Sequence, residues 1–171
     1  MGQTDFGEFH CSIARTVDVV GERWTPMILR DVVLGVTRFD DIQRDLGVAR
    51  NVLAARLEAL VQDGILERKA YQENPVRHDY VLTQKGRELA TALLALMAWG
   101  DRWADGGDGP PVQLVHEACG EHTDPALTCS CCGEPLALDE LTAEAGPGGR
   151  IGRGTEVVGR RLAEAPHRIL R

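Results

Sequence analysis

From Arg38 to Leu82 the sequence runs RFDDIQRDLGVARNVLAARLEALVQDGILERKAYQENPVRHDYVL. This stretch predicts two short helices, a two-stranded hairpin and the start of a further helix, in that order. The order is typical of a winged helix-turn-helix, in which the second helix enters the major groove of DNA. We therefore expect a mainly α fold with a small β-hairpin wing (α+β), followed by a small Cys-rich C-terminal appendage.

The two helices of this stretch are predicted over residues 39–46 and 50–63. Gly47 and Gly64 follow them directly, and each permits the left-handed backbone conformation that ends a helix. The link between the helices is as short as a helix-turn-helix requires. The apolar residues predicted to face inward are Phe39, Ile42 and Leu46 in the first helix and Leu53, Leu57 and Leu60 in the second.

The outward face of the second helix carries candidates for contact with bases. Arg50 and Asn51 lie near its start, and their side chains can form bidentate hydrogen bonds with guanine and adenine edges. Ala54 and Ala55 continue this face with side chains small enough for close approach to a groove. We predict that these four residues face bases and that this helix is the recognition helix.

The hairpin is predicted to have strands over residues 65–71 and 77–82, joined by a protruding loop with Asn74-Pro75. Cations on the recognition helix and on these strands are candidates for contact with DNA phosphates. The alternative is that they form a solvated face without a partner. The order of the elements favours contact with DNA. The phosphate candidates are Arg56, Arg68, Lys69 and Arg77.

Further motifs lie on both sides of this stretch and overlap its end. They are CSIAR at Cys11–Arg15, VVGERW at Val19–Trp24, ILRD at Ile28–Asp31 and YVLTQKG at Tyr80–Gly86. Together, over residues 8–105, they resemble the HxlR-type family of bacterial transcriptional regulators. The resemblance implies a homodimeric winged-helix protein, related in architecture to MarR-type regulators, that binds an inverted-repeat operator. We expect a repressor, with residues 8–105 as its DNA-binding and dimerisation domain.

Cys11 matches the position at which many regulators of this family respond to electrophiles or oxidants. It directly precedes the first predicted helix, whose positive dipole end favours a thiolate. Its oxidation would shift two recognition helices relative to one another. The alternative is a buried and inert cysteine.

The sequence departs from the family pattern at Ala49-Arg50, where relatives often carry a hydroxyl residue that caps the helix. Without this cap, the helix loses about 1 kcal/mol of stability.

The charges do not mark the whole chain as a nucleic-acid binder. The net charge is -7, which disfavours indiscriminate binding to DNA. From Arg38 to Leu82, seven Lys and Arg stand against eight Asp and Glu. The acids at 40, 41 and 45 lie on the first helix, whereas most cations lie on the recognition helix and the wing. A protein-interaction winged helix without DNA binding is therefore the alternative function.

A thiol oxidoreductase that uses Cys129-x-x-Cys132 is a third class of function. Such motifs usually open a helix beside a βαβ unit, and no alternating β/α pattern is present in this sequence. We therefore predict that the protein is not an enzyme.

Helices are also predicted on both sides of the helix-turn-helix. Ile13, Val17, Val20 and Trp24 recur at helical spacing, and Thr25-Pro26 reads as the N-cap and first residue of the next helix. A long helix over residues 83–105 exceeds what the core of so small a domain can cover. We predict a homodimer through the first helix and helix 83–105, bound to a palindromic double-stranded DNA operator. The seam residues of the long helix are Leu89, Leu93, Leu96, Gly100 and Trp103.

The segment Gly106–Pro111 breaks the long helix, and a Cys-rich appendage follows over residues 112–140. Its spacing of cysteines suits a structural zinc ion, for which the predicted ligands are Cys119, His122, Cys129 and Cys132. His116-x-x-Cys119 is available in place of Cys119-x-x-His122. The competing hypothesis is a set of reduced or oxidised thiols without metal. Residues 141–171 are predicted to form a flexible basic tail.

The N-terminal residues 1–7 are polar, unlike a signal peptide. No apolar run approaches the length of a membrane span. We therefore expect a cytoplasmic protein, in which cysteines serve reactivity or metal binding more often than disulfides.

Overall fold

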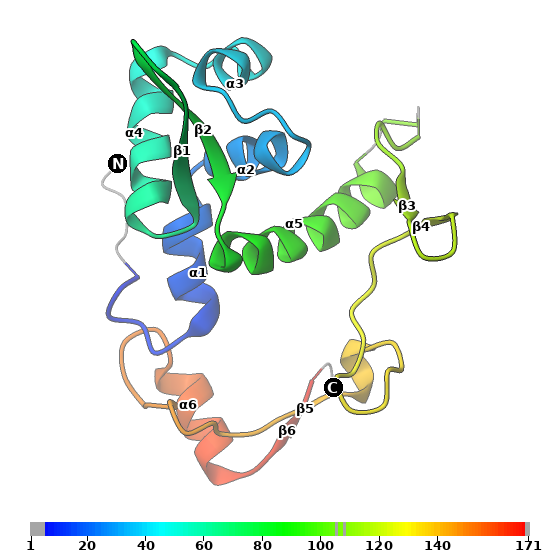
Figure 1. Ribbon diagram of the computed structural model, residues 1–171. Helices are drawn as coiled ribbons and strands as arrows, with labels where there is room; N and C mark the ends of the chain where they lie inside the picture. Colours follow the sequence, from blue (N-terminus) through cyan, green and yellow to red (C-terminus); the bar gives the residue numbers. More distant parts are fainter. Residues whose placement is uncertain (1–5, 105, 108, 170–171) are drawn as a thin grey trace. The chain divides into compact units, whose positions relative to one another are not determined.

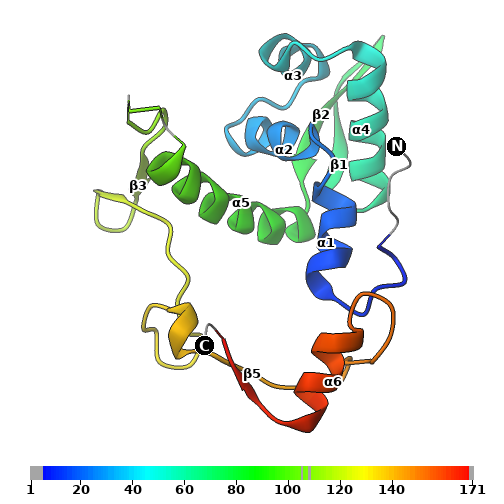
Figure 2. The same ribbon diagram turned by 180° about the vertical axis from the view of Figure 1, so that it is seen from behind.

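The computed structural model describes residues 6–104, 106–107 and 109–169, and the chain forms two compact units. One unit spans Arg23–Ala126. The other combines the described residues up to Glu22 with those from Leu127 onward. Figures 1 and 2 show the elements of both units from opposite sides.

The unit Arg23–Ala126 is a winged helix-turn-helix, so the expected α+β fold is confirmed. The hairpin lies beside the second helix of the helix-turn-helix, and the long helix leads away from it (Figure 1). In chain order the elements are α2 (Thr25–Val33), α3 (Phe39–Leu46), α4 (Arg50–Gln62), β1 (Leu66–Glu73), β2 (Val76–Leu82), α5 (Gln84–Trp103), β3 (Leu114–His116) and β4 (Glu121–Thr123).

The core of this unit lies where α2, α3, α4 and the hairpin meet. The inward positions predicted for α4 are all buried, whereas Phe39 and Leu46 at the two ends of α3 are only half-buried. Each fully buried side chain of this size contributes roughly 1.5–3 kcal/mol. The side chains with 2% exposure or less include Ile28, Leu29, Ile42, Leu53, Leu57, Leu60, Ile65 and Leu66.

The predicted glycine stops end both helices of the helix-turn-helix. Gly47 has a φ of 60°, and its N–H donates to the Gln43 carbonyl at 3.1 Å. Gly64 has a φ of 67°, and its N–H donates to the Val61 carbonyl at 3.0 Å. Ala49 is the N-cap of α4 and forms no side-chain cap, as the sequence indicated.

The wing is longer than the sequence predicted. Its register runs from Leu66 opposite Leu82 to Glu73 opposite Val76, so the turn contains only Asn74-Pro75. The register shifts between Ala70 and Gln72, and this bulge lets both strands continue into the predicted loop.

Two hydrogen bonds attach the chain before α3 to the edge of β2. The Tyr80 N–H donates to the Thr37 carbonyl at 2.8 Å, and the Thr37 hydroxyl donates to the Asp79 carboxylate at 2.8 Å. The wing is therefore anchored to the helix-turn-helix along its base.

A cluster of charges links α2 to α3. Arg30 of α2 donates to the Asp31 carboxylate and, at 2.6 Å, to Asp45 of α3. Asp31 is only 2% exposed, and loss of hydration raises its pKa although Arg30 opposes the shift.

The helix ends near the N-terminus differ from the prediction. The first helix, α1 (Ser12–Val20), ends before Gly21, whose N–H donates to the Val17 carbonyl at 2.7 Å. Trp24 therefore lies outside it and is the N-cap of α2. Thr25 is the first residue of α2 rather than its cap. At the start of α5, Thr83 is the N-cap rather than the first helical residue, and its hydroxyl accepts a hydrogen bond from the Gly86 N–H. The predicted helix end at Asp105 lies outside the described residues.

The predicted flexible tail contains regular structure in its described part, residues 141–169. It forms β5 (Thr142–Ala143), α6 (Glu156–Glu164) and β6 (His167–Arg168), after a short helix, η1 (Leu138–Glu140). These elements also make long-range contacts, which composition does not reveal. The Arg168 guanidinium donates to the Asp139 carbonyl at 2.8 Å, and Arg153 pairs with Glu8 at 2.9 Å.

Among the residues that the structure describes, none of the helices combines the length and the apolar character needed to cross a membrane.

Candidate DNA-binding surface

The outward face of α4 is exposed as the sequence predicted. Arg50, Asn51, Ala54 and Ala55 are all exposed, while Leu53 on the opposite side has no exposed surface. Because the buried leucines fix the rotation of α4 about its axis, the outward face is held rigidly. This arrangement leaves two polar side chains and two small ones exposed on one face of α4.

The start of α4 is electrostatically linked to α3. Arg50 pairs with the Asp40 carboxylate at 2.7 Å, and its guanidinium lies 4.7 Å from the centre of the Phe39 ring. The hydrogen bond from Arg50 holds the pKa of Asp40 below its ordinary value, and the charge of Arg77 on the wing acts in the same direction. Arg50 therefore pairs with the Asp40 carboxylate, and Arg77 acts on it only through its charge.

A second ion pair joins the wing to α4. Arg68 of β1 pairs with Glu58 of α4, and its guanidinium lies 5.9 Å from the centre of the Tyr80 ring. The hydrogen bond from Arg68 lowers the pKa of Glu58. The separation of acids from cations seen along the sequence is therefore not kept in space, because an acid faces Arg50 and another faces Arg68.

Lys69 does not share a face with Arg68. Its ammonium lies 3.3 Å from Glu67, and both residues line a cavity of about 430 Å³ together with Thr37 and Arg87. Successive side chains of a strand point to opposite faces, so the structure separates two residues that the sequence reasoning had grouped. Arg56 of α4 is half-buried, and Arg77 on β2 is exposed.

Two further cations border this surface and had no role assigned from the sequence. Arg38 lies 4.4 Å from the centre of the Tyr71 ring and 3.6 Å from the Asp79 carboxylate. Arg44 pairs with Asp41 at 2.9 Å and is 77% exposed. The position of Arg38 depends on the way that the wing folds back onto α3, which no local sequence signal indicates. Arg44 and Asp41 are instead three residues apart on the same helix, a spacing at which side chains meet.

Cys11 is the N-cap of α1, as the sequence predicted. Its carbonyl accepts a hydrogen bond from the Arg15 N–H at 3.1 Å, and its thiol makes no cap hydrogen bond. The residue is half-buried, so part of the cysteine is accessible to small reagents.

The predicted metal ligands lie in two places along the fold. Cys119 and His122 belong to the β3–β4 hairpin, and Cys129 and Cys132 belong to a loop of the other unit. Over the described ranges, no group of three or more His, Cys, Asp or Glu side chains is arranged to hold a metal ion. Hydrogen bonds from the backbone N–H groups of Cys132 and Cys131 lower the pKa of Cys129. The ligand set stays a prediction.

Comparison with known proteins identifies the family. A family model described as HxlR-like helix-turn-helix matches residues 19–108. The uncharacterized HTH-type transcriptional regulator Rv3095 of Mycobacterium tuberculosis is 46% identical over 137 residues, which cover 80% of this chain and 87% of the relative. The crystal structure of PA1607, a proposed transcription factor, has a TM-score of 0.71 and 34% identity over 88% of this chain and 99% of that chain.

A structure of the redox regulator HypR in its reduced form is also similar. It has a TM-score of 0.51 and 29% identity over 54% of this chain and 92% of that chain. These matches confirm the resemblance that the sequence motifs indicated. The chain belongs to the HxlR-like helix-turn-helix family of transcriptional regulators.

Proposed function

We propose that the protein is a dimeric, sequence-specific DNA-binding regulator that represses transcription at an inverted-repeat operator. The observation that carries this proposal is the outward face of α4, where Arg50 and Asn51 stand exposed beside two alanines. Arginine and asparagine are the residues that most often read guanine and adenine in the major groove. A helix with its buried side fixed in the core suits this role.

The wing supplies the proposed contacts with the DNA backbone. Arg68 lies on the strand face that carries its ion pair with α4, and Arg77 lies near the tip of the hairpin. Arg77 is exposed, and its charge acts on the nearby Asp40 carboxylate, whose ion pair is with Arg50. These two residues have the strongest support, whereas Arg56 and Lys69 remain candidates from the sequence.

The proposed dimer rests on apolar faces that stay exposed. Leu96, Trp99 and Trp103 of α5 are 62%, 62% and 70% exposed, and their spacing places them on one face of the helix. On α1, Ile13 and Val17 are 75% and 39% exposed. A dimer formed through these helices would place two recognition helices roughly 34 Å apart, one turn of DNA.

A protein-interaction module without DNA binding is the second candidate function. The ion pairs of Arg50 with Asp40 and of Arg68 with Glu58 favour it, because they reduce the positive potential of the surface. Binding to DNA must exchange these carboxylates for phosphates.

Operator binding tests the proposal. We expect the protein to bind the intergenic DNA beside its own gene in a salt-dependent, sequence-specific manner. Asn51→Ala is expected to weaken this binding about 10- to 100-fold and to relax the preference at one base position in each half-site, because one bidentate contact is lost. Fluorescence anisotropy with the operator and with scrambled DNA measures both effects.

The matched control is Gln84→Ala, which removes an exposed amide side chain of α5 outside the proposed surface. Its operator affinity should stay close to that of the unmodified protein. If Asn51→Ala binds the operator with unchanged affinity and sequence preference, α4 does not read bases. Equal affinity of the unmodified protein for operator and scrambled DNA would favour the protein-interaction module.

We also propose that Cys11 makes operator binding responsive to oxidants or electrophiles. The similarity to HypR, described as a redox regulator, supports this, as does the partial exposure of Cys11 before α1. Diamide is expected to release the unmodified protein from its operator, while Cys11→Ser should remain bound. Equal release of both proteins in a mobility-shift titration would remove Cys11 from the response.

A further inference from the structure

A cavity of about 590 Å³ lies within the unit Arg23–Ala126. Its walls come from α2, from α5 and from residues 111–114, and Asp45 of α3 also lines it. Most of the lining side chains are aliphatic, among them Leu34, Leu94 and Leu114. Sites for small organic molecules have volumes of roughly 300–1,000 Å³ and predominantly apolar walls. The cavity therefore has the size and the lining of a small-molecule site.

The face of α5 that lines this cavity differs from the face assigned to the proposed dimer. Ala90, Leu94, Met97 and Asp101 line the cavity, and their spacing places them on one side of the helix. Leu96 belongs to both faces, whereas the two tryptophans of the dimer face are not among the lining residues. The cavity and the proposed dimer therefore use largely different surfaces of α5.

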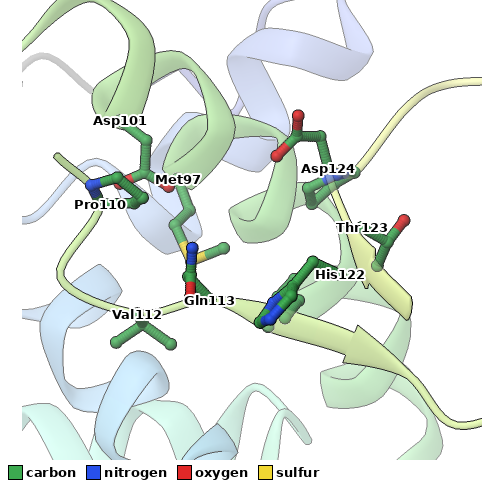
Figure 3. A pocket seen from close by; sticks show the side chains of 10 residues that line it. Met97, Asp101, Pro110, Val112, Gln113, His122, Thr123 and Asp124 are labelled. Atoms are coloured by element: carbon green, nitrogen blue, oxygen red, sulfur yellow. The ribbon is translucent and has the colours of Figure 1, made fainter. Parts of the chain in front are cut away.

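The segment before β3 borders two cavities. A second cavity, of about 160 Å³, shares Met97, Asp101, Val112 and Leu114 with the first. Figure 3 shows Met97 and Asp101 extending from α5 beside Pro110 and Val112. Because the segment leaves space on α5, it can move to admit a ligand without unpacking the core of the unit.

Asp31 supplies a buried acceptor at the wall of the larger cavity. Its side chain is 2% exposed, and its Oδ1 atom accepts hydrogen bonds from Arg30, one of them from Nε at 2.9 Å. The other oxygen, Oδ2, is buried, and no residue that the structure describes donates a hydrogen bond to it. A buried acceptor without a donor is costly, and more so when it carries charge. A ligand that donates a hydrogen bond to Oδ2 would remove that cost.

The charges that line the cavity are mainly negative. Asp31, Asp45 and Asp101 supply three carboxylates, and Arg30 is the one cation among the described residues that line it. The guanidinium of Arg30 is shared between Asp31 and Asp45. Burial raises the pKa of Asp31, and the charge of Asp45 adds to this shift although Arg30 opposes it. A positive charge in the cavity would therefore be favoured.

We propose that this cavity binds a small organic amine in its protonated form, with an apolar body attached to the nitrogen. The ammonium N–H donates to Oδ2 of Asp31, Asp101 contributes its negative charge, and the apolar body fills the aliphatic part of the cavity. A quaternary ammonium lacks the N–H that Oδ2 needs, and an anion would be repelled by the carboxylates. None of the residues proposed to contact DNA lines the cavity, so the site stands independently of the proposed function.

Three compounds with one apolar body test the chemistry of the site. Adamantylamine has both the charge and the N–H donors, trimethyladamantylammonium has the charge alone, and adamantane carboxylate has the opposite charge. Calorimetric titration of the full chain without DNA should show saturable binding of the amine. We expect the other two compounds to bind at least about 10-fold more weakly. No saturable binding of the amine at millimolar concentration, or equal affinity for either other compound, would overturn the proposal.

Two substitutions locate the bound amine. Asp31→Asn should weaken its binding by about 10-fold or more and Asp101→Asn by about 3-fold, because Asp101 acts through its charge alone. Asp101→Asn should fold normally, since a carboxylate in the last turn of α5 opposes the helix dipole. Circular dichroism checks the folding of each variant.

The matched control is Asp63→Asn, which removes an exposed carboxylate at the C-cap of α4. It should bind adamantylamine with the affinity of the unmodified protein. If the folded Asp31→Asn and Asp101→Asn variants also keep that affinity, the amine binds elsewhere and the proposal is wrong. Should Asp31→Asn fail to fold, unchanged affinity of Asp101→Asn alone would overturn it.

Discussion

Replacement of Leu96 and Trp103 by glutamate is expected to convert the proposed dimer into a monomer and to weaken operator binding by about 100-fold or more. Both side chains lie on the exposed apolar face of α5 with Trp99. Two glutamates on this face of each protomer would place unpaired charges in a desolvated interface. Once each half-site is bound separately, the gain from simultaneous binding is lost.

Light scattering after gel filtration measures the mass of the variant, and anisotropy with full operator and half-site DNA measures its binding. Half-site affinity should match that of the unmodified protein, because α4 is untouched. The matched control is Thr91→Glu, which adds the same charge at an exposed position of α5 outside the apolar face. A double variant that remains a dimer would place the interface elsewhere.

Gly86→Ala is expected to destabilise the winged helix by about 3 kcal/mol or more. A Cβ atom at this position would overlap the carbonyl oxygen of Ile65 and lie 3.1 Å from the Leu82 side chain. The carbonyl cannot move aside readily, because it accepts a hydrogen bond from the Thr83 N–H at 3.0 Å. Ile65 itself is 1% exposed. The strain therefore falls on the junction of α4, β2 and α5.

Urea unfolding followed by circular dichroism measures this loss. Gly100→Ala is the control in the same helix, since an added Cβ there has no neighbour within 4 Å. In a helix interior it should stabilise the protein by roughly 0.5–1 kcal/mol. A Gly86→Ala variant as stable as the unmodified protein would contradict the close packing at this junction.

Local signals were sufficient to predict the helix-turn-helix. Gly47 and Gly64 end their helices through backbone conformations that glycine adopts freely, so the limits of α3 and α4 follow from the residues themselves. The leucines of α4 are buried because their spacing matches the helical repeat. The exposed Arg50 and Asn51 follow from the same repeat.

Tertiary contacts decided the features that the sequence did not predict. The pairing of Arg50 with Asp40 joins two helices, and no periodicity within either helix indicates it. The described part of the predicted tail forms a helix and short strands and contacts distant segments, as Arg153 does with Glu8. By contrast, the alternation of side chains along a strand was sufficient to predict that Arg68 and Lys69 point to opposite faces.

The ion pairs of Arg50 with Asp40 and of Arg68 with Glu58 give the free protein its own counterions. A cation that already has a carboxylate partner gains little from a random phosphate, so fewer small ions are released on arbitrary DNA. At a matching site, contacts with bases offset the cost of exchanging the carboxylate partners for phosphates. The regulator would therefore spend little time on the vast excess of unrelated chromosomal sequence, and fewer molecules per cell would keep its operator occupied.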